Sequence, residues 1–333
     1  MPAESLLSRW VRCFCLLLAL VSLSSLLAWD ATGHRLSVYV AYEEMTQNQR
    51  EYWREILQHH PRFASDFEQA MPATLLAAHR DEQTRWLLGQ AAVWPDLARG
   101  LPDAIGPRYN RPDWHWIDGA WVRDEARTHG NLYVDTPPLP DVPGAPAINS
   151  RHATHASNVL TALERARWQL EHEGDAAQRA IALCWLLHLI GDIHQPLHTG
   201  GLVTARLFPD GDRGGNGIRL RDGNLHALWD QALRGPTIND SLATLNTFAA
   251  GLPTEQTFAP TSWLQESRRI LLQQVYPASI IEPVRQSENT GSALGSIILS
   301  QQYLDAMQQT ATIRLAEAGV RIRITLADIT GSL

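Results

Sequence analysis

The chain has 333 residues, of which 44% are hydrophobic, and this is enough for a sizeable buried core. Its formal net charge is −7, from 28 Lys and Arg against 35 Asp and Glu. This acidic balance argues against a protein that binds double-stranded DNA, or any other partner, through a basic surface. Positive charge for a phosphate-containing ligand would have to come from metal ions.

The first 28 residues have the pattern of a secretory signal peptide. Arg9 and Arg12 precede sixteen uncharged, leucine-rich residues that end at Ala28. This run is short for a membrane-spanning helix, which needs roughly 20 apolar residues, although an uncleaved anchor is the alternative. We expect cleavage after Ala28, a secreted or periplasmic protein, and no membrane contact after cleavage. Cleavage removes one Glu and two Arg, which leaves a net charge of −8.

The cysteines exclude an intramolecular disulfide in the mature chain. Cys13 and Cys15 lie in the signal segment, and only Cys184 remains after cleavage. Cys184 lies in a strongly apolar run, so we interpret it as a small buried hydrophobic residue. A secreted protein without disulfides depends on its core or on metals for stability.

Helical periodicity dominates the chain after residue 29. Helices are predicted from near Gly33 and over 157–171, because apolar residues recur there at helical spacing. Residues 176–193 are almost continuously apolar, which predicts a central buried helix. Further helices are expected at 48–58, 72–88, 224–234, 240–250, 262–275 and 295–318. No alternating run is long enough for a sheet and no linker is visible, so we expect one all-α domain over 29–333.

Two segments, 100–150 and 204–223, are rich in Pro, Gly and Asp and are predicted to be long loops. Long loops within a compact helical domain are unusual unless they serve a site. We therefore expect these two segments to border a functional site.

Two pairs of histidine and aspartate carry the strongest chemical signal. His188 and Asp192 are four residues apart in the apolar helix and share one face, and His226 and Asp230 repeat this spacing. Such a pair lets one helix offer two ligands to zinc. A lone buried histidine is more often a core residue, but an ionised aspartate in so apolar a helix costs several kcal/mol unless it is paired or metal-bound. We interpret both pairs, with the nearby His198, as metal ligands.

Further candidate ligands lie upstream. Asp96 and His115 fall in expected loops, where ligands can be aimed freely. If cleavage occurs after Ala28, the chain begins at Trp29, whose free amino nitrogen and carbonyl oxygen can chelate a metal. His34 lies about one helical turn further on.

In this order, these residues resemble the trinuclear-zinc, single-strand-specific nucleases secreted by fungi and plants, which belong to the phospholipase C/nuclease superfamily. The motifs that carry the resemblance are Trp29…His34, Trp94-Pro95-Asp96, Trp114-His115-Trp116-Ile117-Asp118, His188-x-x-x-Asp192-x-His194-Gln195-Pro196-Leu197-His198 and His226-x-x-x-Asp230. Fungal and plant members carry disulfides and this chain forms none, which suggests a bacterial-type member.

The resemblance implies three zinc ions per chain. The first would be held by Asp96, His115, His188 and Asp192. The second would be held by the Trp29 amino terminus and carbonyl, His34 and the shared Asp192, and the third by His198, His226 and Asp230. His194 matches no ligand position and is interpreted either as a residue that supports the ligands or as a structural residue. The other histidines are expected to be surface or capping residues: His59, His60, His79, His129, His152, His155 and His172.

The resemblance also implies hydrolysis of single-stranded DNA and RNA, and of 3′-nucleotides, to 5′-phosphate products by a hydroxide that bridges two zinc ions. Arg99 would contact the phosphate, and its alternative is an ordinary surface arginine. Trp116 would stack a base and Asp118 would accept a hydrogen bond from it, although Trp116 could simply be a core residue. Asn216 is expected near the third zinc. No stable protein partner is implied, and we expect a monomer.

Two rival functions remain open. A zinc-dependent phospholipase C shares the three-zinc arrangement, but it has a longer gap than that between Trp29 and His34, and usually Glu where this chain has Asp230. A non-catalytic zinc-storage protein is the other rival. Structural zinc sites are closed by four protein ligands, whereas the third site here would have three.

Overall fold

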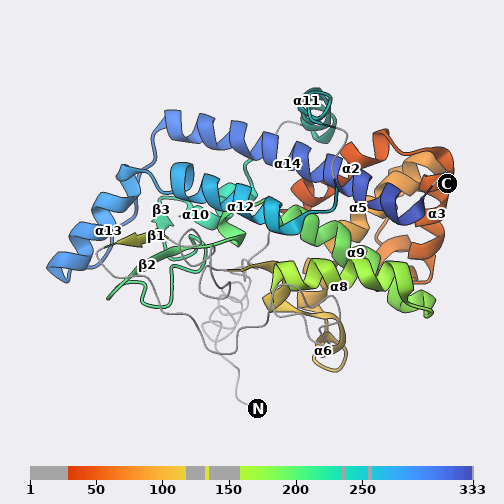
Figure 1. Ribbon diagram of the computed structural model, residues 1–333, viewed down its shortest axis with the longest axis horizontal. Helices are drawn as coiled ribbons and strands as arrows, with labels where there is room; N and C mark the ends of the chain where they lie inside the picture. Colours follow the sequence, from red (N-terminus) through yellow and green to blue (C-terminus); the bar gives the residue numbers. More distant parts are fainter. Residues whose placement is uncertain (1–28, 118–131, 135–157, 235–236, 254–256, 332–333) are drawn as a thin grey trace, which may run out of the picture.

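The computed structural model describes residues 29–117, 132–134, 158–234, 237–253 and 257–331, and it is predominantly helical, as predicted (Figure 1). The α-helices are α2 (Ala31–Glu43), α3 (Gln47–Gln58), α4 (Ala73–Leu76), α5 (Arg80–Leu97), α6 (Gly106–Tyr109), α8 (Val159–His172), α9 (Ala176–Ile193), α10 (Leu225–Asp230), α11 (Ile238–Ala249), α12 (Pro260–Ile270), α13 (Ala278–Thr290) and α14 (Gln301–Thr330). The single turns that carry site residues are η2 (Ala98–Gly100), η3 (Pro112–His115) and η5 (Pro196–His198).

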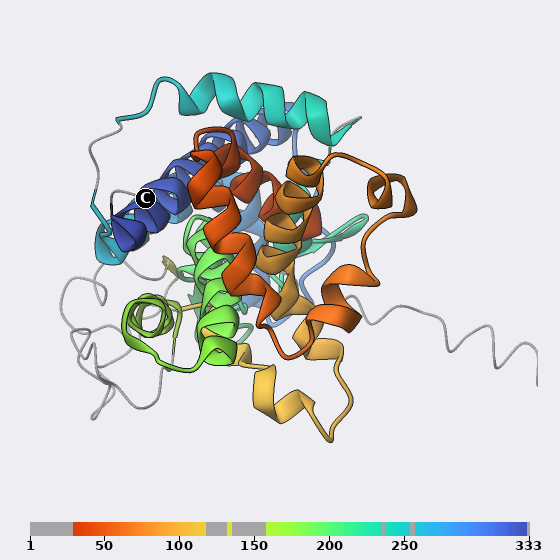
Figure 2. The same ribbon diagram turned by 90° about the vertical axis from the view of Figure 1, so that its right-hand side faces the viewer.

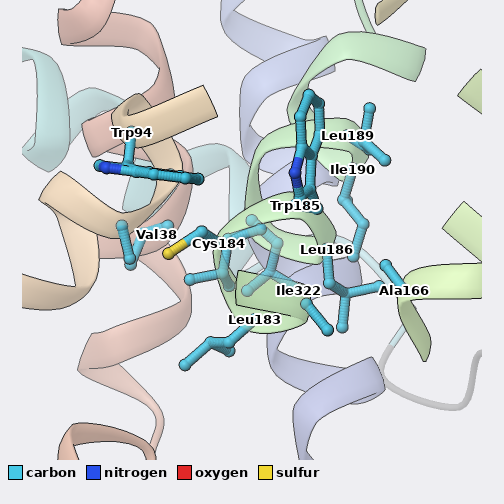
Figure 3. Packing of buried hydrophobic residues seen from close by; sticks show 14 of the residues in the cluster. Val38, Trp94, Ala166, Leu183, Cys184, Trp185, Leu186, Leu189, Ile190 and Ile322 are labelled. Carbon is cyan, nitrogen blue, oxygen red and sulfur yellow. The ribbon is translucent and has the colours of Figure 1, made fainter. Parts of the chain in front are cut away.

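Helix α9 is the central buried element. Asp175 caps its first turn by accepting hydrogen bonds from the backbone N–H groups of Ala177 and Gln178, and Pro196 follows its end. Figure 3 shows side chains of α9 packed between residues of α2, α5, α8 and α14, namely Val38, Trp94, Ala166 and Ile322. Cys184 is buried in this cluster, as predicted. The helix is long and apolar enough to cross a membrane, but 72% of it is buried inside the fold.

The end of α9 separates two hydrophobic clusters. The larger cluster joins α2, α3, α5, α8 and α9 and includes Ile193, and a second cluster begins with Leu197. Figure 1 places the first group of helices at one end of the molecule and the strands with α13 at the other. Figure 2 shows α11 (turquoise) lying across the edge of the molecule, where it packs on α14 and α2. Asp192 and His198 therefore lie at the junction of two rigid cores.

The expectation of no sheet is wrong, because the structure has two small ones. Strand β1 (Leu132–Val134) pairs in parallel with β2 (Leu202–Thr204), and β3 (Arg219–Leu220) pairs antiparallel with β4 (Gly223–Asn224). Strands of two or three residues are too short to show an alternating pattern in a sequence.

Several predicted helix bounds are also wrong. The segment 72–88 divides into α4 and α5, and α5 continues to Leu97 because Pro95 lies in its last turn, where it removes little of the helix hydrogen bonding. Helix α13 falls in a stretch where no helix was expected, and α14 ends at Thr330 instead of near 318.

Gly319 permits the close crossing of α14 over α2. A Cβ atom on Gly319 would lie 2.5 Å from the Cβ of Val40 and 2.8 Å from the backbone oxygen of Ser37. We expect Gly319→Ala to lower the free energy of unfolding by about 1–3 kcal/mol, because this contact cannot relax without separating the helices. Urea unfolding measures the change. Gly174→Ala is the control, since a Cβ there meets nothing within 4 Å, and equal stability of the two variants would contradict the crossing argument.

Candidate metal centre

The last two turns of α9 present two buried polar side chains on one face. His188 and Asp192 are each 0% exposed. Asp192 Oδ2 lies 3.0 Å from His188 Nε2 and 3.1 Å from His115 Nδ1, while Oδ1 lies 3.5 Å from His34 Nε2. The two carboxylate oxygens therefore face different histidines, which is the arrangement that allows one aspartate to bridge two metal ions.

Eight of the predicted ligand side chains lie in three groups, and the ligand atoms within each group are within 4.8 Å of one another. The groups are Asp96 with His115 and His188; His34 with His188 and Asp192; and His198 with His226 and Asp230. All eight side chains are buried. They come from α2, α5, η3, α9, η5 and α10, so tertiary packing brings together residues that are up to 196 positions apart, from His34 to Asp230.

Backbone carbonyl groups orient three of the imidazoles. His188 Nδ1 donates to Ala92 O at 2.7 Å, His198 Nδ1 donates to His115 O at 2.6 Å, and His226 Nδ1 donates to Gly214 O at 2.6 Å. A carbonyl oxygen can only accept, so each of these rings carries a proton on Nδ1 and, in its neutral form, has its lone pair on Nε2. In that neutral form, Nε2 can bind a metal ion.

Polar atoms without a hydrogen-bond partner concentrate in this cluster. Among the described residues, His34 Nδ1 and Nε2, Asp96 Oδ1, His115 Nε2, Asp192 Oδ1 and His198 Nε2 are buried and have no such partner. An unsatisfied buried polar group costs about 1–3 kcal/mol. The concentration of these unpartnered atoms in one cluster is expected if they bind cations. Imidazole nitrogen together with carboxylate oxygen is a ligand set that suits zinc.

Burial sets the protonation states of most of the cluster. It lowers the pKa of His115 and of His226 to about 3, and it lowers the pKa of His34 well below its usual value, so these imidazoles are neutral near pH 7. Burial also raises the pKa of Asp96 to about 6 and that of Asp230 well above its usual range. Neutral imidazoles are the form that binds metal.

His188 and Asp192 are the exceptions. Burial lowers the pKa of His188, but the charges of Asp192 and Asp96 outweigh burial and raise it overall. Burial likewise raises the pKa of Asp192, and the charges of His188 and His198 with the hydrogen bonds from His115 and His188 hold it well below its usual value. The carboxylate of Asp192 is therefore the negative centre of the site.

The residues at the expected mature start are tied to the same cluster. Trp29 is fully buried, and its ring Nε1–H donates to Gly191 O at 3.0 Å, while the Asp30 N–H donates to Asp230 O at 3.1 Å. Asp30 also caps α2, the helix that carries His34. A Cβ atom at Gly191 would lie 2.8 Å from His34 Nδ1, so only glycine fits there. Residues 29 and 30 thus connect the ends of α9 and α10.

A cavity of about 400 Å³ opens beside the cluster. Its lining includes His115, His198 and His226, together with Arg99, Trp116, Arg213 and Asn216. Trp116 is 41% exposed, so the alternative that it is a core residue is wrong. Arg99 Nη2 lies 3.2 Å from Asp96 Oδ1, which places this arginine between the cluster and the cavity. Asp118 lies outside the described residues.

Three expectations about individual residues need correction. Asp96 and His115 do not lie in loops, because Asp96 is in the last turn of α5 and His115 ends the turn η3. His60 is not a surface residue: it is 3% exposed and packs against Trp94, with the ring centroids 4.3 Å apart.

Two other histidines behave as predicted. His79 caps α5 by accepting from the backbone N–H of Asp81. His194 is buried and structural, with Nδ1 donating to Ile190 O and Nε2 accepting from Arg321, each at 2.6 Å.

The loop 211–217 lies in segment 204–223, which was predicted to border the site, and Asn216 lines the cavity; the roles of Gly214 and Arg213 were not predicted. Gly214 orients His226, and Arg213 lines the cavity. The glycine-rich run Gly211-Asp212-Arg213-Gly214-Gly215-Asn216-Gly217 is the signal that could have indicated both roles, because consecutive glycines permit close approach of a backbone.

Comparison with known proteins shows similarity to nucleases. The family described as S1/P1 nuclease matches residues 29–331. Endonuclease 1 of Arabidopsis thaliana is 24% identical over 326 residues, which cover 93% of this chain and 90% of that protein. Endonuclease 3 of the same plant is 27% identical over 265 residues, or 73% of this chain and 76% of that protein. Endonuclease 4 is 29% identical over 174 residues, which cover 45% of this chain and 51% of that protein.

Proposed function

This chain belongs to the S1/P1 nuclease family and is a hydrolase of nucleic acids, and on that premise we propose that it is a secreted enzyme with three zinc ions. Its proposed substrates are single-stranded DNA and RNA and 3′-nucleotides, and its products carry 5′-phosphates. The observation that carries this proposal is the set of three adjoining His/Asp groups with their unpaired donor atoms.

The proposed ligands follow these groups. One ion would be held by Asp96, His115, His188 and Asp192, a second by the Trp29 amino terminus and carbonyl, His34 and Asp192, and a third by His198, His226 and Asp230. When bound, zinc lowers the pKa of coordinated water toward 7 and neutralises developing charge on a phosphoryl group. Asp192 would hold the first two ions together through its two oxygens.

Residues of the cavity would position the substrate. Arg99 lies next to Asp96, so its guanidinium is placed to donate hydrogen bonds to a phosphate held by the cluster. Trp116 has an exposed face beside His115, and a base could stack on it with roughly 1–3 kcal/mol. Stacking needs an unpaired base, which is the physical basis of the proposed preference for single strands.

The proposed secretion depends on the sequence before Trp29. Arg9, Arg12 and the apolar run that ends at Ala28 have the signal-peptide pattern, and the family match begins at residue 29, where the mature domain 29–333 would start. Removal of residues 1–28 would also free the Trp29 amino group. Export and metal binding would thereby be linked, because the second ion would gain its terminal ligand only in the processed protein.

A direct assay tests the proposal. The protein that starts at Trp29 is given a single-stranded 20-nucleotide DNA, the same strand in a duplex, and phosphatidylcholine vesicles. We expect the single strand to be cleaved roughly tenfold faster than the duplex, or more. EDTA should abolish the activity, and added zinc should restore it. Cleavage of the lipid without cleavage of DNA would favour a phospholipase C, and activity that is unaffected by EDTA would contradict metal dependence.

A further inference from the structure

Arg213 has an unusual backbone conformation beside the cavity. Its φ is 57°, and it is the only non-glycine residue with positive φ among the described residues. Such a conformation is uncommon for a residue with a side chain and persists where the surroundings hold it in place. The neighbours Gly211, Gly214 and Gly215 also have positive φ. The loop therefore has a defined backbone conformation, and Arg213 occupies a left-handed position that normally favours glycine.

The buried side chain of Asp212 fixes this loop to neighbouring elements. Asp212 is 1% exposed; its Oδ1 accepts from the Leu202 N–H at 3.0 Å, and its Oδ2 accepts from the Tyr276 hydroxyl at 2.8 Å. The Asp212 N–H in turn donates to Leu202 O at 2.9 Å. The residue directly before Arg213 therefore has little freedom, and the position from which the Arg213 side chain extends is well defined.

The same loop is pressed against the third His/Asp group. Gly214 O accepts the Nδ1 proton of His226, and a Cβ atom at Gly214 would lie 2.3 Å from Leu197 O, next to His198. Arg213 is therefore one residue away from the group that orients His226. Its side chain lines the cavity that His198 and His226 also line.

Arg213 is available to a ligand. Its side chain is exposed and has no hydrogen bond or ion pair with the described part of the chain, although Asp210 lines the same cavity. A guanidinium is always charged and presents a planar fork of donors that matches a phosphate. Arg99, by contrast, lies against Asp96 of the first group. The two arginines thus belong to different parts of one cavity.

We propose that Arg213 binds the phosphate on the 5′ side of the scissile one, and so makes the enzyme favour strands over substrates with a single phosphate. This inference rests on the proposed nuclease function. There, His198, His226 and Asp230 would hold a zinc ion that would stabilise negative charge on the departing 3′-oxygen. The nucleotide that carries this oxygen continues to the next phosphate on its 5′ side. A 3′-nucleotide or a dinucleoside monophosphate lacks that phosphate and would gain nothing from Arg213.

Two dinucleotides isolate this contact. Thymidylyl-thymidine (TpT) has only the scissile phosphate, and its 5′-phosphorylated form (pTpT) adds the phosphate assigned to Arg213. We expect the wild-type enzyme to show roughly tenfold higher kcat/KM on pTpT than on TpT, because a charge-assisted hydrogen bond has about this effect. Arg213→Gln should bring this ratio close to one. On a ten-nucleotide strand, the variant should also lower the slope of log kcat/KM against log salt by about 0.7.

Control variants separate binding from loop structure. Arg213→Gly suits the positive φ and should lose the preference for pTpT with an intact loop, while Arg213→Lys should restore part of it. Arg219→Gln removes the same charge from an exposed residue outside the cavity lining and should keep the wild-type ratio. An equal ratio in wild-type and Arg213→Gln enzyme would overturn the proposal. Wild-type enzyme that cleaves neither the dinucleotides nor the longer strand would instead overturn the nuclease function on which it rests.

Discussion

The Asp192→Asn variant should lose nuclease activity by roughly 1,000-fold or more and should retain one zinc ion in place of three. Asp192 Oδ1 faces His34 and Oδ2 faces His115 and His188, so one substitution removes the negative centre of two adjoining groups. The group of His198, His226 and Asp230 keeps its own ligands. Elemental analysis of the purified protein and kcat/KM on single-stranded DNA measure the two effects.

The same substitution elsewhere provides a control for Asp192→Asn. Asp66 is partly buried and paired with Arg62, outside the His/Asp groups. Asp66→Asn should keep three zinc ions and activity within about twofold, since substitutions away from a site have small effects. Zinc should also raise the unfolding temperature of Asp192→Asn less than that of the wild type, because fewer bound ions stabilise the native state. Full zinc content with near-normal turnover would exclude Asp192 as a bridging ligand.

One extra residue before Trp29 should lower activity by roughly 100-fold or more and reduce the zinc content from three ions to two. A free α-amino group has a pKa of about 7.7–8.0 and offers a lone pair when deprotonated, whereas an amide nitrogen does not. Trp29 is fully buried and bonded to Gly191, so the chain has little room to move aside and restore the geometry.

Two purified proteins test this requirement, one that begins at Trp29 and one that begins at Ala28. A third protein carries the additional alanine at its C-terminal end and controls for the change in composition. Mass spectrometry confirms the first residue of each protein before zinc and kcat/KM are measured. If the protein that begins at Ala28 binds three zinc ions and is fully active, the amino terminus of Trp29 is not a ligand.

The spacing of residues along the sequence was enough to predict part of the candidate site. The helical period places residues four apart on one face, so His188 with Asp192 and His226 with Asp230 could be paired without a structure. The apolar run that forms α9 predicted a buried helix. A buried aspartate is costly unless it is paired or bound to a metal, so Asp192 indicated a functional role. The resemblance to a known family then supplied the order of the remaining ligands, which no local pattern could provide.

Other features depend on neighbours that are distant in the sequence. Asp96 was predicted to lie in a loop, but α5 continues past Pro95 and carries Asp96 into the cluster. His60 has no local sign of burial and is covered by Trp94 and Tyr109 from other elements. The exposure of Trp116 and the conformation of Arg213 likewise depend on how loops pack against η5 and α10.

The sequence by itself determined the helical class, the central helix α9 and the residue types that make metal chemistry possible, because periodicity and composition act over a few residues. Only the tertiary structure decided that the three groups adjoin, that the oxygens of Asp192 face different histidines, and that Arg213 meets the cavity. Those distances arise from packing two hydrophobic clusters around the end of α9, and packing is a property of the whole chain.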